Sequence, residues 1–219
     1  MKKVLLIILA GMFAFGSALA QPSFTVGLGL NHGVFAGEGR EENFNDGSLN
    51  TVTEEYGAFT DSFASVYVEV GNEVAAIGIS YQGEASTPTN INEANGDTGS
   101  GVQNNTEVSV DFSSVTTLYG LVNLPMNMYA KVGIVSGDIE INETLRSGNS
   151  YADQDLEGYV AGFGYQHEAD AANIRVELLG HTYDDVEANN GVSSSGNLNK
   201  VRVSNMIGAT AQISVNRSF

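Results

Sequence analysis

The chain has 219 residues and a formal net charge of −17, because 26 Asp and Glu outnumber 9 Lys and Arg. This acidic balance argues against nucleic acid as a partner, since phosphate contacts depend on lysine and arginine. The absence of cysteine excludes disulfide bonds and cysteine nucleophiles. With 26 Gly and only 3 Pro, the composition favours many strands and turns over helices.

The first twenty residues have the pattern of a secretory signal peptide. Two lysines precede an apolar run from Val4 to Phe15, and small residues end the segment at Ala20. We expect cleavage after Ala20 and export of residues 21–219 as a single domain. Beyond this segment no apolar run approaches the roughly 20 residues that a membrane helix needs. The lack of such a run does not argue against a membrane β-barrel, because the strands of a barrel carry apolar residues only at alternate positions.

The exported part contains eight runs in which apolar and polar residues alternate with a period of two, as in a strand with two unlike faces. The first run, "FTVGLGLNHGV", places Phe24, Val26 and Leu28 on one face. The fourth run changes phase, which predicts a β-bulge near Ser113 and Ser114. In chain order the runs cover residues 24–34, 63–70, 74–82, 108–124, 128–134, 157–167, 174–179 and 207–219.

The connections between these runs alternate between long and short along the chain. The first long connection is the polar segment 35–57, and the first short one is the turn "GNE" at 71–73. Short turns at one end and long polar loops at the other are typical of a bacterial outer-membrane barrel. We therefore predict an all-β fold, an eight-stranded antiparallel up-and-down transmembrane β-barrel. Its expected location is the bacterial outer membrane, after export through the periplasm.

The face opposite the apolar one favours a membrane barrel over the alternative, a soluble β protein. In a soluble barrel this face would lie in water and carry long polar side chains, whereas here it is rich in glycine. Small residues suit a crowded interior, and eight strands enclose an interior just wide enough for side chains to fill. The glycines on this face are Gly27, Gly29, Gly78, Gly133, Gly162, Gly164 and Gly208.

Four charged residues share this predicted inner face, namely Glu69, Lys131, Arg175 and Glu177. Each lies close to a short turn, so all four are expected in the periplasmic half of the barrel. Their charges sum to zero, and buried charges need partners. We predict a salt-bridge cluster that closes the barrel. The alternative interpretation is an ion-selective constriction.

The last run, "IGATAQISVNRSF", ends in Phe219. Together with "IRVELLGHTYDDVE", it resembles the small eight-stranded outer-membrane barrels that include the opacity-type surface antigens and the transmembrane domain of outer-membrane protein A. The resemblance implies insertion by the outer-membrane assembly machinery, which recognises a last strand ending in Phe. We therefore expect Phe219 to serve as an insertion signal and as an aromatic anchor at the membrane interface.

No catalytic, cofactor or metal site is predicted. The candidate imidazole bases are His32, His167 and His181. His181, in "GHTYDD", lacks the His-x-Ser pattern of a lipid A deacylase, and a histidine at a barrel rim is more often interfacial than catalytic. The acidic segments "NFNDGSLN" and "NEANGDTGSG" do not match the calcium-binding loop with its distant glutamate.

The sequence thus favours a non-enzymatic surface or structural barrel with long acidic extracellular loops, which suit adhesion or another surface interaction. The first alternative is a small porin or a narrow channel for ions or solutes, and a lipid-modifying enzyme is the less favoured second. The expected partners are outer-membrane lipid, lipopolysaccharide and, during biogenesis, the assembly machinery. An extracellular partner is left open.

Overall fold

The computed structural model describes residues 22–86, 90–93, 105–144, 151–191 and 198–219. Within these ranges the chain forms strands and no helix, and so no helix that could cross a membrane. The predicted signal peptide, residues 1–20, lies outside the described residues. The strands are β1 (Ser23–Asn45), β2 (Ser48–Gly71), β3 (Ala75–Gln82), β4 (Ala85–Ser86), β5 (Asn90–Glu93), β6 (Asn105–Asn123), β7 (Met128–Thr144), β8 (Gln154–His167), β9 (Asn173–Tyr183), β10 (Val186–Asn189) and β11 (Leu198–Ser218).

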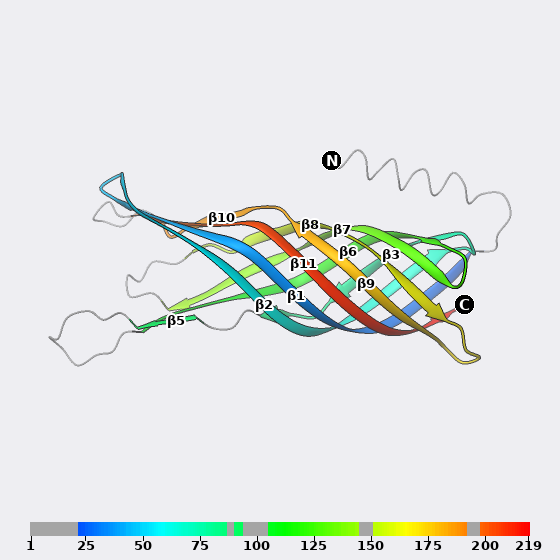
Figure 1. Cartoon of the computed structure of the whole chain (residues 1–219). Helices are drawn as coiled ribbons and strands as arrows, with labels where there is room; N and C mark the ends of the chain where they lie inside the picture. Colours follow the sequence, from blue (N-terminus) through cyan, green and yellow to red (C-terminus); the bar gives the residue numbers. More distant parts are fainter. Residues whose placement is uncertain (1–21, 87–89, 94–104, 145–150, 192–197) are drawn as a thin grey trace.

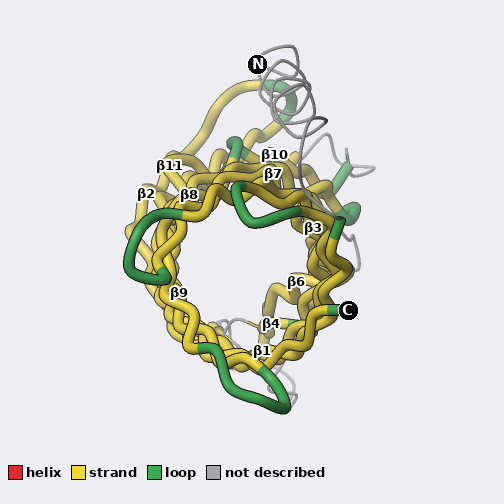
Figure 2. Tube along the Cα trace, turned by 90° about the vertical axis from the view of Figure 1, so that its right-hand side faces the viewer, coloured by secondary structure: helices red, strands yellow, loops and turns green. Residues whose placement is uncertain are grey.

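Eight of the described strands close a ring in which neighbours run antiparallel (Figures 1 and 2). Their order is β1-β2-β3-β6-β7-β8-β9-β11, and β11 pairs with β1 to complete the ring. The remaining short strands extend this wall, since β4 and β5 pair with β6 and β10 pairs with β11. The ring confirms the predicted eight-stranded, antiparallel up-and-down barrel.

The two ends of the barrel differ as the connection lengths predict. Short turns join β2 to β3, β6 to β7 and β8 to β9 at one end. At the other end the segment 35–57 is not a loop, and that prediction is wrong. It is a β-hairpin whose two-residue turn, Asp46–Gly47, has positive φ at both residues, as in a type I′ turn. The polar composition of this segment led to the wrong prediction. Outside the lipid, two strands can continue to pair through their backbones although neither has an apolar outer face.

A β-bulge resolves the change of phase in β6. The β6–β7 register shifts between Ser113 and Thr116, and Ser114 has a φ of 53°. Before the bulge Phe112 lines the interior, and after it the buried side chain is Val115. The extra residue turns odd positions inward in place of even ones. The predicted bulge is therefore confirmed, and it brings apolar residues of both phases, such as Phe112 and Val115, to the interior.

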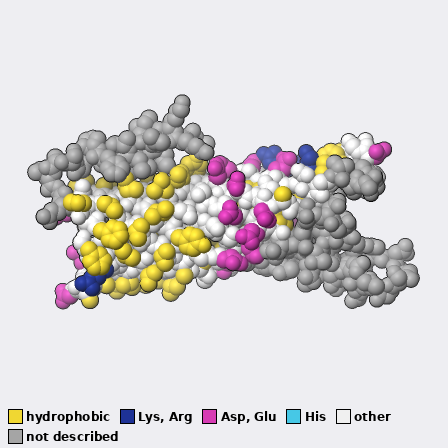
Figure 3. Space-filling model, turned by 180° about the vertical axis from the view of Figure 1, so that it is seen from behind, with side chains coloured by type: hydrophobic (Ala, Val, Ile, Leu, Met, Phe, Trp, Pro, Cys, Tyr) yellow, Lys and Arg dark blue, Asp and Glu magenta, His cyan; other side chains and the backbone are white. Residues whose placement is uncertain are grey.

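The outer face of the ring carries an apolar belt. Alternate residues on most strands are large, apolar and exposed, as in the case of Leu30, which is 67% exposed. Figure 3 shows these side chains covering the barrel towards one end, with Asp and Glu lying beside them. An apolar surface of this extent is stable against lipid and not against water. Members of the belt include Leu28, Val66, Ile79, Val132, Phe163, Leu178 and Ile213.

Candidate functional site

The half of the barrel next to the short turns is closed by charged side chains. Glu69, Lys131, Arg175 and Glu177 are all buried, with Glu69 3% and Glu177 2% exposed. Arg175 Nη1 lies 2.7 Å from Glu69 Oε1, and Lys131 Nζ lies 3.0 Å from Glu177 Oε2. The structure therefore brings the four predicted residues together as two ion pairs inside the ring. We call these four residues, with the three tyrosines described next, the plug.

Tyrosine side chains complete the hydrogen bonding of the plug. The hydroxyl of Tyr119 donates to Glu69 Oε1 at 2.8 Å, and that of Tyr129 donates to Glu177 Oε1 at 2.6 Å. Each buried carboxylate thus has a cation and a hydroxyl as partners, which offsets the cost of burying its charge. The third tyrosine, Tyr67, is buried and bonds to Ser214 at 3.1 Å between the two hydroxyl oxygens.

Glycines on neighbouring strands make room for these rings. A Cβ atom added to Gly78 would lie 2.5 Å from the ring of Tyr119, and one added to Gly164 would lie 2.3 Å from the ring of Tyr129. Each ring therefore lies directly over the backbone of the next strand. This close approach gives the glycine-rich inner face of the sequence a packing role.

A layer of neutral polar side chains lies beyond the plug. Gln212 Nε2 donates to Asn31 Oδ1 at 2.9 Å and to Ser65 Oγ at 2.8 Å. Asn31 Nδ2 in turn donates to Ser65 Oγ at 3.0 Å. All three side chains are buried, so this layer and the plug together occupy most of the interior over this half of the barrel.

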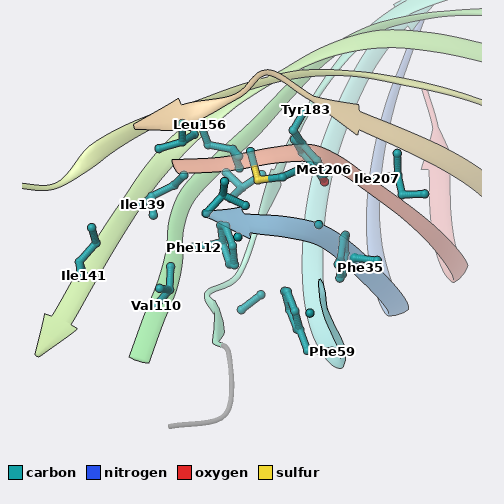
Figure 4. Close-up of a pocket in the computed structure, with 18 of the residues that line it drawn as sticks. Phe35, Phe59, Val110, Phe112, Ile139, Ile141, Leu156, Tyr183, Met206 and Ile207 are labelled. Atoms are coloured by element: carbon teal, nitrogen blue, oxygen red, sulfur yellow. The ribbon is translucent and has the colours of Figure 1, made fainter. Parts of the chain in front are cut away.

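The other half of the barrel contains an apolar cavity of about 510 Å³, which we call the outer cavity (Figure 4). The labelled side chains come from β1, β2, β6, β7, β8, β9 and β11, and most of them turn inward, whereas Ile207 is exposed. The lining is mostly apolar, in contrast to the polar layer next to it. Among the lining residues are Phe35, Phe59, Phe112, Ile139, Leu156 and Tyr183.

A row of aromatic rings forms one wall of the outer cavity. The ring of Phe59 stacks on that of Phe35, with centroids 5.3 Å apart, and on that of Phe112 at 5.9 Å. The Phe59–Phe112 contact joins β2 to β6. Among the described residues, the β2–β3 ladder has already ended at Ser65–Gln82, before β2 reaches this contact. Stacked side chains therefore link the wall where the backbone ladder does not.

Two positions that line the cavity lack side chains and leave space open. Gly57 lines it, and a Cβ atom added there would meet no atom within 4 Å. Gly39 also lines it, with its nearest such contact at 3.7 Å. These glycines leave space open, whereas Gly78 and Gly164 lie beneath tyrosine rings. The assignment of 35–57 to a loop hides this site from the sequence, although the alternation Phe35-Gly37-Gly39 indicates an inward face.

Beyond the belt, charged side chains pair across strands. Arg202 Nη2 donates to Asp185 Oδ2 at 2.5 Å, and this hydrogen bond lowers the pKa of the Asp185 carboxyl. Arg40 pairs with Glu54 across the β1–β2 hairpin and with Glu42 at 2.8 Å. The Arg202–Asp185 and Arg40–Glu54 pairs are exposed, so they order side chains more than they stabilise the fold.

The remaining predicted residues occupy peripheral or isolated positions. Phe219 pairs with Phe24 through both backbone groups, at 2.8 and 3.1 Å, and its exposed ring lies 5.4 Å from the Arg217 guanidinium carbon. Its role in insertion stays a prediction. His32 bonds to Ser62 through Nδ1 at 2.8 Å. Within the described ranges, no group of three His, Asp or Glu side chains could hold a metal ion.

No protein-family model matches the chain, and no curated protein sequence matches it either. Among solved structures, the outer membrane protein OprG from Pseudomonas aeruginosa is similar, with a TM-score of 0.53 at 12% identity over 93% of this chain and 99% of OprG. Neisserial surface protein A (NspA) has a TM-score of 0.37 at 8% identity over 86% of this chain and 97% of its own. The likeness to OprG shows the fold alone. With this fold and a lipid-facing apolar belt, the chain is a β-barrel of the bacterial outer membrane.

Proposed function

We propose that this barrel is a non-enzymatic protein that binds a small apolar molecule in its outer cavity. The observation that carries the proposal is the contrast between the two halves of the interior. One half is filled by the plug and the polar layer, and the other holds an apolar space of about 510 Å³. Binding sites for small molecules commonly measure about 300–1,000 Å³ and have mostly apolar walls.

The filled half favours binding over conduction. An open pore needs a continuous aqueous path. Here the two ion pairs cross the bore, and so does the Asn31–Ser65–Gln212 layer, whose side chains bond to one another. A narrow channel would have to break these bonds at a cost of several kcal/mol. We therefore place the channel function second to ligand binding.

The surroundings of His181 support the non-enzymatic part of the proposal. His181 Nε2 lies 2.9 Å from Thr210 Oγ1, a distance at which a base could activate a hydroxyl. The other ring nitrogen, Nδ1, is buried and has no hydrogen-bond partner among the described residues. A catalytic triad needs an acidic group at that position to orient the base and stabilise its charge.

Filling the cavity tests the proposal. Gly57→Leu adds a side chain where nothing lies within 4 Å, so the barrel should fold while the cavity shrinks. In lipid nanodiscs, naphthalene should shift the methyl resonances of Ile139 and Leu156 in the unchanged protein and not in Gly57→Leu. The matched control is Gly180→Leu, because Gly180 is exposed on the lipid side of β9.

This control separates loss of the cavity from a general effect of an added leucine. Gly180→Leu should respond to naphthalene as the unchanged protein does. The proposal fails if naphthalene shifts neither methyl in the unchanged protein, or if it shifts both equally in Gly57→Leu.

A second candidate function is the surface interaction expected from the sequence. The β1–β2 hairpin continues past the apolar belt to Asp46–Gly47 and carries several carboxylates, which supports contact with a molecule outside the cell. Deleting 42–52 removes the tip without touching residues that line the cavity. If the hairpin mediates attachment, bacteria with the shortened chain should adhere less to host cells while naphthalene binding persists. Unchanged adherence would contradict this function.

A further inference from the structure

A small polar chamber of about 20 Å³ adjoins the outer cavity on the side of the plug. Phe63 and Gln82 line both spaces, so the cavity and the chamber share a wall. His181 lines the chamber, while Phe35 and Tyr183, whose ring centroids lie 6.2 and 6.0 Å from that of His181, line the cavity. The imidazole therefore lies at the boundary between the apolar and the polar space.

Several polar groups of the chamber are already paired, whereas one ring nitrogen of His181 is both buried and unpaired within the described part of the chain. Asn31 and Gln212 bond to each other and to Ser65, while Lys131 is held by Glu177. His181 is only 9% exposed, and its Nε2 is paired with a threonine hydroxyl. Its Nδ1 is buried and has no partner among the described residues. A buried polar atom in this state gains more from a new hydrogen bond than an atom that is already paired.

We propose that the outer cavity selects apolar molecules that carry one hydroxyl group, alcohols or phenols, over the corresponding hydrocarbons. The apolar body occupies the cavity and the hydroxyl enters the chamber, where a turn of the buried imidazole brings His181 Nδ1 into hydrogen-bond contact with it. A hydroxyl both donates and accepts, so it suits either tautomer of the imidazole. The chamber is large enough for one such oxygen. This inference rests on the proposed function and adds the chemical class of the ligand.

A matched pair of probes tests this selectivity. Naphthalene and 2-naphthol have the same apolar body and differ by one hydroxyl. In nanodiscs, dissociation constants from the methyl shifts of Leu156 should favour 2-naphthol by about tenfold in the unchanged protein. In the double variant His181→Phe/Thr210→Val, which removes both partners of the histidine–threonine bond, the ratio should fall to about one. Thr210→Val alone keeps Nδ1 and should keep the preference.

A direct measurement covers the case in which the variant does not fold. With ¹⁵N-labelled histidine, 2-naphthol should shift the Nδ1 resonance of His181, and naphthalene should not. The inference is overturned if the two probes bind equally, if the double variant keeps the preference, or if Nδ1 does not respond to 2-naphthol. Equal binding would mean that water already serves Nδ1, and the proposed function would still stand. If neither probe binds, both proposals fall.

Discussion

Removing the guanidinium of Arg175 is the sharpest perturbation of the plug. In Arg175→Met, Glu69 keeps its bond from the Tyr119 hydroxyl at 2.8 Å but loses the cation at 2.7 Å, and it remains only 3% exposed. Removing one partner of a buried ion pair costs about 3–5 kcal/mol. Because the tyrosine bond survives, we expect the lower end of this range, about 3 kcal/mol.

The loss is measured as a change in the free energy of unfolding in urea, with the barrel in lipid vesicles and followed by far-UV circular dichroism. The chain has no Trp, so its intrinsic fluorescence is less informative. The double variant Glu69→Gln/Arg175→Met removes both charges and should recover at least half of the loss. Arg202→Met breaks an exposed pair and should show no measurable change. A loss below about 1 kcal/mol for Arg175→Met, or no recovery in the double variant, would refute the burial argument.

Three further outcomes follow from the same structure. Tyr129→Phe leaves Glu177 with Lys131 but without its hydroxyl donor, and should lower the free energy of unfolding by about 1–2 kcal/mol in the same urea titration. The Arg202–Asp185 pair, which lowers the pKa of Asp185, is formed above about pH 4 and is lost as the pH falls through the lower folded value. The protection factors of nearby amides, which correct for the slower intrinsic exchange in acid, should therefore fall on acidification, and Asp185→Asn should remove this dependence. Phe219→Ala should reduce the fraction of chain that reaches the outer membrane, measured by fractionation of cells, whereas equal amounts would argue against an insertion signal.

The barrel and its inside-out arrangement can be predicted from the sequence because lipid imposes a strict pattern. Wherever a strand crosses the belt, alternate side chains must be apolar, and the period of two then assigns each of the other residues to the interior. Glu69 and Arg175 lie 106 positions apart, yet this assignment places both on one face near a short turn. The charges of the four plug residues sum to zero and the bore of an eight-stranded barrel is small, so the sequence also predicts that they pair with one another.

The outer cavity could not be predicted in the same way, because beyond the belt water meets the outer face and the pattern disappears. In 35–57 both faces contain polar or small residues, so glycines that leave a space open look like glycines of a turn. The tyrosine partners of the plug depend on which strand lies beside which glycine. That information resides in the register, for example Gly78 opposite Tyr119, and not in the local sequence.

The β1–β2 hairpin also places its turn far from the lipid, where other molecules can reach it before they reach the barrel. From Val34 at the belt to Asn45 at the turn, a tilted strand rises roughly 25–30 Å, at about 3.3 Å per residue. Its tip joins two regularly paired strands through a two-residue turn, so the ladder below needs nothing from the tip's side chains. A peptide inserted between Asp46 and Gly47 would stand clear of the lipid on a stiff support. With this end facing outside the cell, as proposed above, the hairpin offers a site for displaying a foreign epitope, where an antibody could bind it without disturbing the cavity.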